Sequence, residues 1–507
     1  MNRMKCSLPL VLLGLAMVAT DPWFAHIDDE CAIIEAAKHP VRQTVGLFLH
    51  GTGQHEHPPL YDLILHGWLR ITGARMRLLR LPAVLFFLAG LWALGQAAAE
   101  MEGHSSASKM VWIGALWPYG FHFGRLAGWY SFSFLLVALL TWAYVCFVKV
   151  PTRARWVWMF MSALALVYAN YFAWALLGCL AIDFAVLHRQ ELATVWRPIV
   201  GTGLLLVVAY LPLWRPFWRE VMAGVQPGGG HTWLGSLLSG VYNLYTMFVS
   251  ESVGPWFWAL SVPAGLGIAA CLLVTCLQAP SASQRFFIYF VLLLASMTVL
   301  GIGNVRRLLL IAPWLLLPVA AALAITGNAY RRGVLALSLA LVAAVGWYGI
   351  ATRRYYGAPR WVEPWTELAL EGAETVRQGG VVIADSTPFF FNLRYALAAG
   401  QANRIDCTFG PSPSTLGSDR VYDPVQWRTA GNPIGQHTLL IKGLHFGTPE
   451  GPMQETELWL DQRCALEGES RLVPDPGWKA KQRYFPQFRQ LPWRIEARLY
   501  NCMGELN

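Results

Sequence analysis

The chain has 507 residues, of which 55% are hydrophobic and only 14% are charged, and its formal net charge is +9. This composition is too apolar for a soluble enzyme of that length and indicates a polytopic membrane protein. The basic excess lies entirely in residues 1–350, with 22 basic and 13 acidic residues, whereas residues 351–507 hold 17 of each. Such a distribution is typical of loops that orient a membrane protein and argues against a nucleic-acid-binding surface.

The first predicted element is an apolar run from Leu8 to Thr20, which follows two basic residues. Its apolar core of about a dozen residues would also suit a cleaved signal peptide. The continuation Pro22-Trp23-Phe24 favours a retained first helix that ends at the membrane interface.

Three adjacent carboxylates, Asp28, Asp29 and Glu30, follow this helix directly. Side-by-side like charges repel one another and cost free energy when they leave water. One explanation is a solvated loop at a helix end, and the other is a reactive site beside the membrane.

Residues 57–73 (HPPLYDLILHGWLRITG) are too short and too polar for a confident span, because Asp62 and His66 interrupt the apolar run. We expect an amphipathic helix that lies on the outer membrane surface. Ten later segments are long enough to cross the membrane: about 81–99, 108–124, 129–148, 156–170, 171–187, 198–213, 254–278, 286–302, 308–326 and 333–350.

The basic loops orient these segments. With a cytoplasmic N-terminus, the loops that contain Lys149, His188, Arg285 and Arg331 all fall on the cytoplasmic side, as the positive-inside rule requires. The arginines between residues 70 and 80 fall outside and run against the rule. The scheme predicts about eleven transmembrane helices and an extracytoplasmic C-terminus, in a protein of the cell inner (plasma) membrane.

The composition changes at about residue 351. Residues 381–386 and 437–446 are typical of short strands, and residues 365–380 predict a helix that ends at glycine. We therefore divide the chain into a transmembrane domain, 1–350, with an outer loop and surface helices at about 21–80, and an extracytoplasmic α/β domain, 351–507. We read residues 226–233 (QPGGGHTW) as a flexible outer-loop segment.

The nine cysteines indicate no metal site, because no pair has CxxC spacing. Cys407, Cys464 and Cys502 lie in the tail, where an oxidising compartment would allow one disulfide. The sequence leaves its pairing open.

The polar residues of the outer face form one candidate constellation: Asp28-Asp29-Glu30, then Glu56-His57-Pro58-Pro59, then Arg125, and finally Arg306-Arg307. A carboxylate can take a proton from an acceptor hydroxyl, and arginines can bind a phosphate leaving group. Each element also has a structural reading. Prolines start helices, Arg125 can reach the headgroups from a span, and Arg306-Arg307 can anchor to anionic lipid.

The order of these motifs resembles that of the GT-C membrane glycosyltransferases, specifically the dolichyl-phosphate-mannose protein mannosyltransferase-like group, which includes bacterial aminoarabinose and lipid A sugar transferases. The resemblance covers roughly residues 8–350. The matching positions are Asp29-Glu30, His57-Pro58-Pro59-Leu60-Tyr61, Arg80-Leu81-Pro82, then Pro118, Arg125, Ala127 and Tyr130, and finally Arg306-Arg307-Leu308. The family's second outer loop often reads Arg-Glu-x-Arg-Met-Tyr, whereas this chain has Arg125-Leu126-Ala127-Gly128-Trp129-Tyr130.

The resemblance implies an inverting transferase that moves a sugar from a polyprenyl phosphate to a lipid-linked glycan, lipid A or a protein hydroxyl. By matching, Asp29 is the candidate base, with Asp28 as the alternative and Glu30 in support. The residues implied to bind substrate are His57, Pro58, Tyr61, Arg125, Tyr130, Arg306 and Arg307. No metal ligand is assigned, although clustered acids can bind a divalent ion.

Two other classes of membrane protein could have this composition. A transporter or lipid flippase would place ionisable residues near the bilayer midplane, but the predicted spans hold almost none, and Asp183 lies near a cytoplasmic end. A membrane anchor that presents the tail as a binding domain would not need the ordered acidic and HPPLY motifs.

Overall fold

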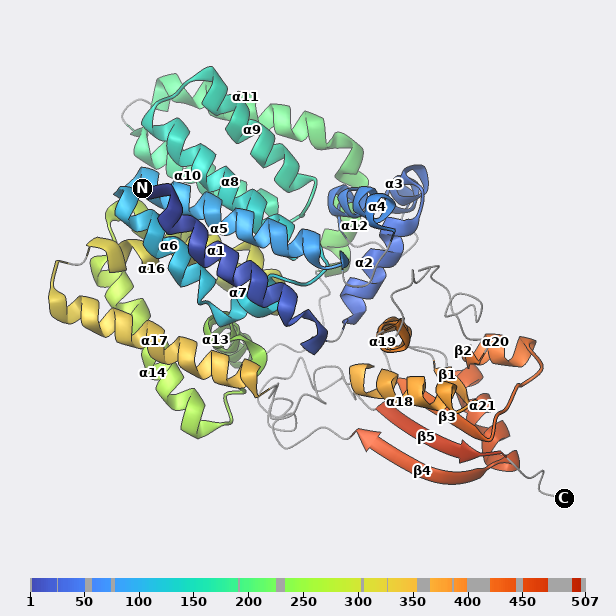
Figure 1. Ribbon diagram of the computed structural model, residues 1–507. Coiled ribbons are helices and arrows are strands. Elements are labelled where there is room, and N and C mark those ends of the chain that lie inside the picture. Colours follow the sequence, from blue (N-terminus) through green and yellow to red (C-terminus); the bar gives the residue numbers. More distant parts are fainter. Residues whose placement is uncertain are drawn as a thin grey trace. The chain divides into compact units, whose positions relative to one another are not determined.

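Figure 1 shows the computed structural model of the chain. It describes all residues except 1, 25, 51–56, 74–77, 190–191, 225–232, 302–304, 326, 353–364, 385–386, 399–419, 444–449, 473–494 and 503–507. The chain forms two compact units. The bundle unit comprises Met1–Asp21, Ala36–His66 and Arg80–Thr352, and the sheet unit comprises Pro22–Glu35, Gly67–Leu79 and Arg353–Asn507.

The bundle unit is helical throughout its described residues. Its elements are α1 (Asn2–Ala19), α3 (Val41–His50), α5 (Leu81–Glu102), α6 (His104–Ala115), α7 (Pro118–Phe123), α8 (Trp129–Lys149), α9 (Arg153–Val167), α10 (Ala173–Leu187), α11 (Leu192–Tyr210), η4 (Leu211–Leu213), α12 (Trp214–Gly224), α13 (Trp233–Val249), η5 (Ser250–Ser252), α14 (Trp258–Gln278), α15 (Ser281–Val299), η6 (Val305–Leu310), α16 (Pro313–Ile325) and α17 (Ala329–Ala351).

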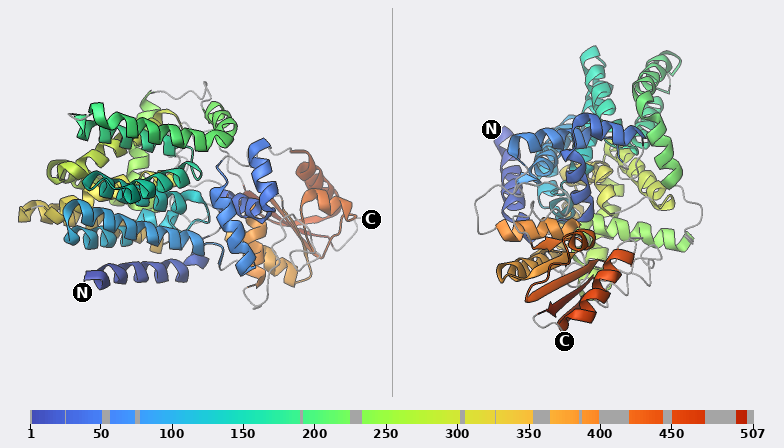
Figure 2. Two further views of the ribbon diagram at one scale, coloured as in Figure 1. Left: turned by 90° about the horizontal axis from the view of Figure 1, so that it is seen from above. Right: turned by 90° about the vertical axis from the view of Figure 1, so that its right-hand side faces the viewer.

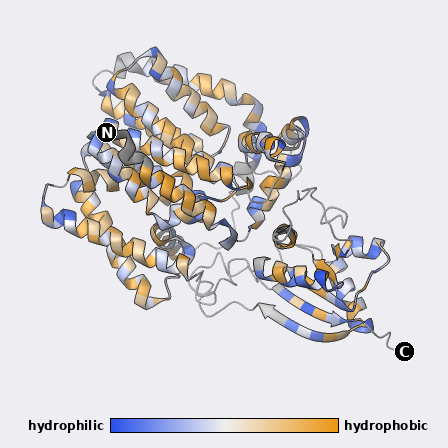
Figure 3. Ribbon diagram, viewed as in Figure 1, coloured by the Kyte–Doolittle hydropathy of each residue, from blue (hydrophilic) through white to orange (hydrophobic). Residues whose placement is uncertain are grey.

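Six helical stretches of the described residues are long and apolar enough to cross a membrane: Leu81–Glu102, Trp129–Lys149, Val200–Arg219, Trp258–Gln278, Ser281–Val299 and Ala329–Ala351. Three shorter apolar helices accompany them: Leu8–Ala19, Ala173–Leu187 and Pro313–Ile325. Figure 3 shows hydrophobic residues along most turns of the bundle helices, and Figure 2 shows these helices running alongside one another. The expected fold class, a polytopic α-helical membrane protein, is confirmed.

Close helix packing in the bundle depends on small residues. A Cβ atom added at Gly90 of α5 would lie 2.5 Å from the Phe134 ring of α8. Glycine at this position therefore lets α5 and α8, the two most buried of the six long apolar stretches, approach each other closely.

Two predicted spans are wrong in detail. The segment 108–124 is divided into α6 and α7 by a break before Pro118, because proline has no N–H to continue the helical hydrogen bonds. The segment 308–326 begins as the 3-10 turn η6 and becomes α-helical only at Pro313.

Helix α13 is absent from the sequence prediction. Its polar residues Ser239, Asn243 and Thr246 lower the apparent hydropathy, but all three are buried. A helix that packs inside a bundle does not need the uniformly apolar surface that a lipid-facing helix needs. The predicted flexible loop at 226–233 lies outside the described residues apart from Trp233, where α13 begins.

Two helices cross the sequence boundaries between the units, namely α2 (Asp28–Lys38) and α4 (Leu60–Thr72). Helix α4 confirms the helix predicted within residues 57–73. Its 13 residues span about 20 Å, which is too short for a hydrocarbon core of about 30 Å. Its position on the membrane surface stays a prediction.

The sheet unit contains five strands in the order β2-β1-β3-β5-β4. They are β1 (Val381–Ala384), β2 (Val421–Tyr422), β3 (His437–Gly443), β4 (Ala465–Leu472) and β5 (Ile495–Asn501). Strand β1 pairs in parallel with β2 and β3, whereas β3, β5 and β4 are antiparallel. The strands predicted within 381–386 and 437–446 are confirmed as β1 and β3.

Helices cover both faces of this sheet. Alternate residues of β1 point to opposite faces, so Val382 packs with α18 (Trp365–Arg377) and α19 (Thr387–Ala398), while Ile383 packs with α20 (Pro424–Thr429) and α21 (Glu450–Arg463). Helix α18 is followed by Gly379 in the left-handed region (φ 80°), which confirms the predicted glycine stop.

A disulfide joins Cys464, just before β4, to Cys502, just after β5. The sequence had allowed one disulfide among three tail cysteines without choosing a pair. The third, Cys407, lies outside the described residues.

Candidate functional site

The acidic motif occupies the first turn of helix α2, in the sheet unit. Carboxylates are favoured there because the exposed N–H groups of a helix start carry partial positive charge. Asp29 is partly exposed and Glu30 is fully buried. For Asp28 the structure describes the backbone alone.

Glu30 has a specific structural role. Its Oε2 accepts a hydrogen bond from the backbone N–H of Ile27 at 3.2 Å, and it lies 3.8 Å from Nδ1 of the buried His26. A glutamate that reaches back to the N–H three residues earlier is one half of a capping box. Glu30 therefore holds the start of α2, while Asp29 remains accessible to solvent.

His26, which lies just before the acidic motif, is bound by helix α19, more than 360 residues later in the chain. The side-chain carboxamide of Asn392 accepts from the N–H of His26 at 3.3 Å and donates to its carbonyl oxygen at 3.4 Å. The His26 and Phe391 rings lie 5.9 Å apart. All of these residues belong to the sheet unit.

The HPPLY motif precedes and enters helix α4, in the bundle unit. The His57 ring lies 4.3 Å from the Trp129 ring, and buried Pro58 follows it. Tyr61 is buried between Phe86 and Phe132, with ring centroids 6.4 and 6.1 Å away. Two of these three aromatic contacts reach the start of α8 and the third reaches α5, so the motif packs against both helices. Glu56 lies outside the described residues.

Asp62 follows this motif and is only 9% exposed. Burial raises the pKa of its carboxyl from 3.8 to about 7, so desolvation outweighs the helix N-terminus, which favours the carboxylate. One turn later, His66 is also buried, and its Nδ1 donates to the Ala37 carbonyl oxygen at 2.8 Å. In the sequence, both residues stand out only as interruptions of an apolar run.

Arg125 is fully buried. Its Nε donates to the Phe121 carbonyl oxygen at 3.1 Å, and its Nη1 donates to the Met17 carbonyl oxygen and the Thr20 hydroxyl, both at 3.0 Å. The last carbonyls of a helix lack intrahelical donors and carry partial negative charge. Arg125 thus caps the C-terminus of α1.

The remaining predicted site residues also lie in the bundle unit. Tyr130 is buried at the start of α8, with its ring 4.4 Å from that of Trp129. Arg306 and Arg307 lie in η6, and both are partly exposed. The Tyr119 hydroxyl fixes this turn by donating to the Val305 carbonyl oxygen at 2.6 Å.

Sequence reasoning missed a buried polar cluster at the junction of α7, α13 and η5. Nδ1 of His122 lies 2.8 Å from the Ser250 hydroxyl, and the Tyr242 hydroxyl donates to Glu251 at 3.1 Å. Ser250 has a φ of 65°, a backbone conformation that non-glycine residues rarely adopt. No local sequence signal marks this cluster, because its residues come from three separate elements.

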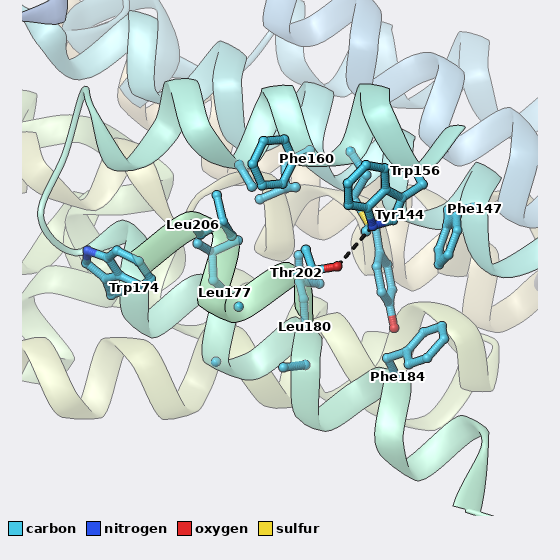
Figure 4. A pocket seen from close by; sticks show the side chains of 16 residues that line it. Tyr144, Phe147, Trp156, Phe160, Trp174, Leu177, Leu180, Phe184, Thr202 and Leu206 are labelled. Atoms are coloured by element: carbon cyan, nitrogen blue, oxygen red, sulfur yellow. Dashed lines mark hydrogen bonds between the residues drawn. The ribbon is translucent and has the colours of Figure 1, made fainter. Parts of the chain in front are cut away.

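An apolar cavity of about 310 Å³ lies among helices α8, α9, α10 and α11 (Figure 4). The side chains of Trp156, Phe160, Leu177 and Leu206 line it, and the Trp156 indole N–H donates to Thr202 at 2.9 Å. Its size and lining are those of a site for an apolar ligand group.

A cluster of hydrogen-bonded polar side chains adjoins this cavity at Tyr144. Tyr144, which lines the cavity, donates to buried Asp183 at 2.6 Å. Arg285 also donates to both carboxylate oxygens, at 2.9 and 3.0 Å, and Tyr289 donates at 3.1 Å. This cluster joins α8, α10 and α15 and satisfies a charge that would be costly alone.

The structure therefore distributes the predicted site residues over the two units. The acids Asp28, Asp29 and Glu30 belong to the sheet unit, and the other predicted residues belong to the bundle unit: His57, Pro58, Tyr61, Arg125, Tyr130, Arg306 and Arg307. Among the described residues, no three His, Cys, Asp or Glu side chains are placed to hold a metal ion.

No family model matches the sequence, and no curated protein matches it. Among solved structures, the chain is similar to the crystal structure of ArnT from Cupriavidus metallidurans bound to undecaprenyl phosphate, with a TM-score of 0.51 and 13% identity. The similarity covers 96% of this chain and 97% of that one. The apo structure of the same ArnT gives a TM-score of 0.49 with 15% identity over the same shares. The chain therefore shares the fold of this ArnT structure, as the order of its motifs predicts.

Proposed function

We propose that this protein is an inverting glycosyltransferase of the inner membrane. It moves a sugar from a polyprenyl phosphate to a hydroxyl of a lipid-linked glycan, lipid A or a protein. The observation that carries the proposal is the similarity over nearly the whole chain to a structure bound to undecaprenyl phosphate.

The base in this proposal is Asp29. Its carboxylate accepts the proton of the acceptor hydroxyl, and the acceptor oxygen forms a bond to the anomeric carbon. The bond from that carbon to the phosphate oxygen breaks on the opposite face, and polyprenyl phosphate leaves with the bonding electrons. Partial exposure of Asp29 and complete burial of Glu30 support this choice. Asp28 is the alternative base.

The leaving phosphate is bound by Arg306 and Arg307 in this proposal. Both guanidinium groups are partly exposed, and η6 is held at Val305 by Tyr119. Charge-assisted bonds from arginine stabilise the negative charge that develops on the phosphate. His57 and Tyr130 line the sugar site, with Pro58 and Tyr61 shaping it. Arg125, which donates to Met17 in the last turn of α1 and to Thr20 just after it, contributes by holding that helix in place.

The isoprenoid chain would occupy the apolar cavity among α8 to α11. Its lining offers hydrocarbon and aromatic surface on four helices, which suits a ligand that carries no polar groups beyond its phosphate.

In this proposal the reaction takes place at the extracytoplasmic face. Disulfides form and persist in oxidising compartments, so the bond between Cys464 and Cys502 supports an extracytoplasmic position for the sheet unit. The N-terminus would then be cytoplasmic, as the basic loops predict.

Mass spectrometry of cell-envelope glycans with and without the gene tests this proposal. Loss of a pentose, hexose or aminosugar would identify the transferred group. The purified protein in lipid nanodiscs should then move that sugar from its polyprenyl phosphate to an extracted acceptor. An unchanged glycan profile together with no transfer in vitro would contradict the proposal and favour a transporter.

A further inference from the structure

We propose that Asn392 of the sheet unit is a positioning residue for the acidic motif. Its side chain fixes the backbone from which Asp29 projects, so the C-terminal domain takes part in catalysis. The inference rests on the proposed function, because it assumes that Asp29 is the base.

The first argument is the complementarity of the two groups. A primary carboxamide presents one acceptor and one donor side by side, as a peptide unit does. Asn392 uses both on His26, accepting from its N–H at 3.3 Å and donating to its carbonyl oxygen at 3.4 Å. One side chain therefore satisfies both polar backbone groups of one residue.

The second argument is burial. His26 and Asn392 are 4% and 6% exposed, so water does not readily replace either partner. Buried backbone groups are almost always hydrogen-bonded, and an unmade bond there is costly. Removal of the carboxamide should therefore move the segment.

The third argument connects this contact to Asp29. The residue after His26 is Ile27, whose N–H donates to Glu30, and α2 begins at the next position. Asn392 thus fixes the backbone immediately before the helix, and Glu30 fixes the first turn. Asp29 lies between these two attachments, so its direction is set by both.

The surroundings of Asn392 explain how it can hold a fixed position. Its neighbours Phe391 and Leu393 are buried, and Leu393 belongs to the core between α19 and the sheet. The carboxamide is therefore presented from a packed helix. A site residue that is supported by rigid elements keeps its geometry better than one supported by a loop.

Asn392→Ala in the full-length protein tests the inference, with Asn501→Ala as the matched control. Asn501 also makes a side-chain hydrogen bond in the sheet unit, to Glu467 at 2.7 Å, but it is remote in sequence from α19 and takes no part in the acidic motif. Asn392→Asp is the second variant. It keeps the size of the side chain and the acceptor oxygen but loses the donor to the His26 carbonyl.

Two readouts are needed. Hydrogen–deuterium exchange should show faster exchange at residues 26–30 in both Asn392 variants and no change in Asn501→Ala. Transfer assays should show kcat lowered at least tenfold with the donor KM within twofold of the wild type. Retention of the Cys464–Cys502 disulfide, measured by mass spectrometry, shows that the domain has folded.

Unchanged exchange at residues 26–30, or kcat within twofold of the wild type in a folded Asn392→Ala protein, would overturn the inference. Failure of the proposed function is distinguishable, because the wild type itself would then transfer no sugar. In that case the exchange measurement alone decides whether Asn392 holds the acidic segment.

Discussion

Glu30 accepts a hydrogen bond from the backbone N–H of Ile27 at 3.2 Å, while its neighbour Asp29 is partly exposed. Two adjacent carboxylates that are equivalent members of the acidic motif in the sequence therefore have different surroundings in the structure. Glu30 stabilises the start of its own helix, whereas Asp29 is partly exposed to solvent.

This difference predicts opposite results for two conservative substitutions. Asp29→Asn should lower kcat by about 10²- to 10⁴-fold, the usual contribution of a general base. Glu30→Gln should keep most of the activity, because glutamine can still accept from the Ile27 N–H in a capping box. Transfer assays in nanodiscs measure both. If Asp29→Asn keeps full activity while Asp28→Asn loses it, the base is Asp28.

The arginines of η6 predict a second set of kinetic effects. Arg306→Ala and Arg307→Ala should each lower kcat/KM by about 10- to 100-fold, because each removes a charge-assisted bond to the leaving phosphate. Arg331→Ala is the control, since this exposed residue lies in the first turn of α17 and its loss should leave kcat/KM within twofold. Normal kinetics in both η6 variants would remove these residues from the site.

Asp62 predicts a pH-dependent stability. Between pH 4 and 7 the folded protein keeps this proton, and the unfolded chain releases it. Stability should therefore fall as the pH rises, by about 1.4 kcal/mol per pH unit at most from this group, and level off above pH 7. Asp62→Asn should abolish this slope, whereas Glu100→Gln, at an exposed position, should keep it. The measurement is the free energy of unfolding in detergent between pH 4.5 and 8. Identical slopes of this free energy against pH in the wild type and Asp62→Asn would contradict the prediction.

The apolar cavity predicts a chain-length effect on the donor. Gly203 lines the cavity, and a Cβ added there meets no atom within 4 Å, so Gly203→Leu should fill the space without a clash. We expect the KM of a long-chain donor to rise about 10- to 150-fold, as displacement of a buried leucine-sized group implies, and that of a two-isoprene donor to stay unchanged.

Gly201→Leu is the matched control for the cavity. It lies two residues away on the same helix, has equal space, and does not line the cavity. Equal effects of the two substitutions would show that the cavity does not receive the isoprenoid chain.

The predicted topology is tested by fusions at the C-terminus. An alkaline phosphatase fused there should be active and a green fluorescent protein dark, because the sheet unit is expected in the oxidising compartment. The opposite pattern would invert the proposed orientation and place the acidic motif on the cytoplasmic side.

The sequence by itself determined the membrane class, most helix positions and the order of the motifs, because hydropathy and helix-stop signals are local properties of the chain. Residues 81–99, for example, form most of α5, and α18 ends at Arg377, two residues before Gly379. Helix α13 was not predicted, because its polar residues are buried only through packing against other helices, which local hydropathy does not reveal.

Only the tertiary structure shows which distant residues form hydrogen bonds and disulfides with one another. Nothing near Arg125 in the chain indicates that it binds the end of α1, and nothing near residue 26 indicates Asn392. The pairing of Cys464 with Cys502 was likewise open until β4 and β5 were placed side by side. The physical reason is that burial and hydrogen bonding depend on which distant segments fold against each other, and that information is spread over the whole chain.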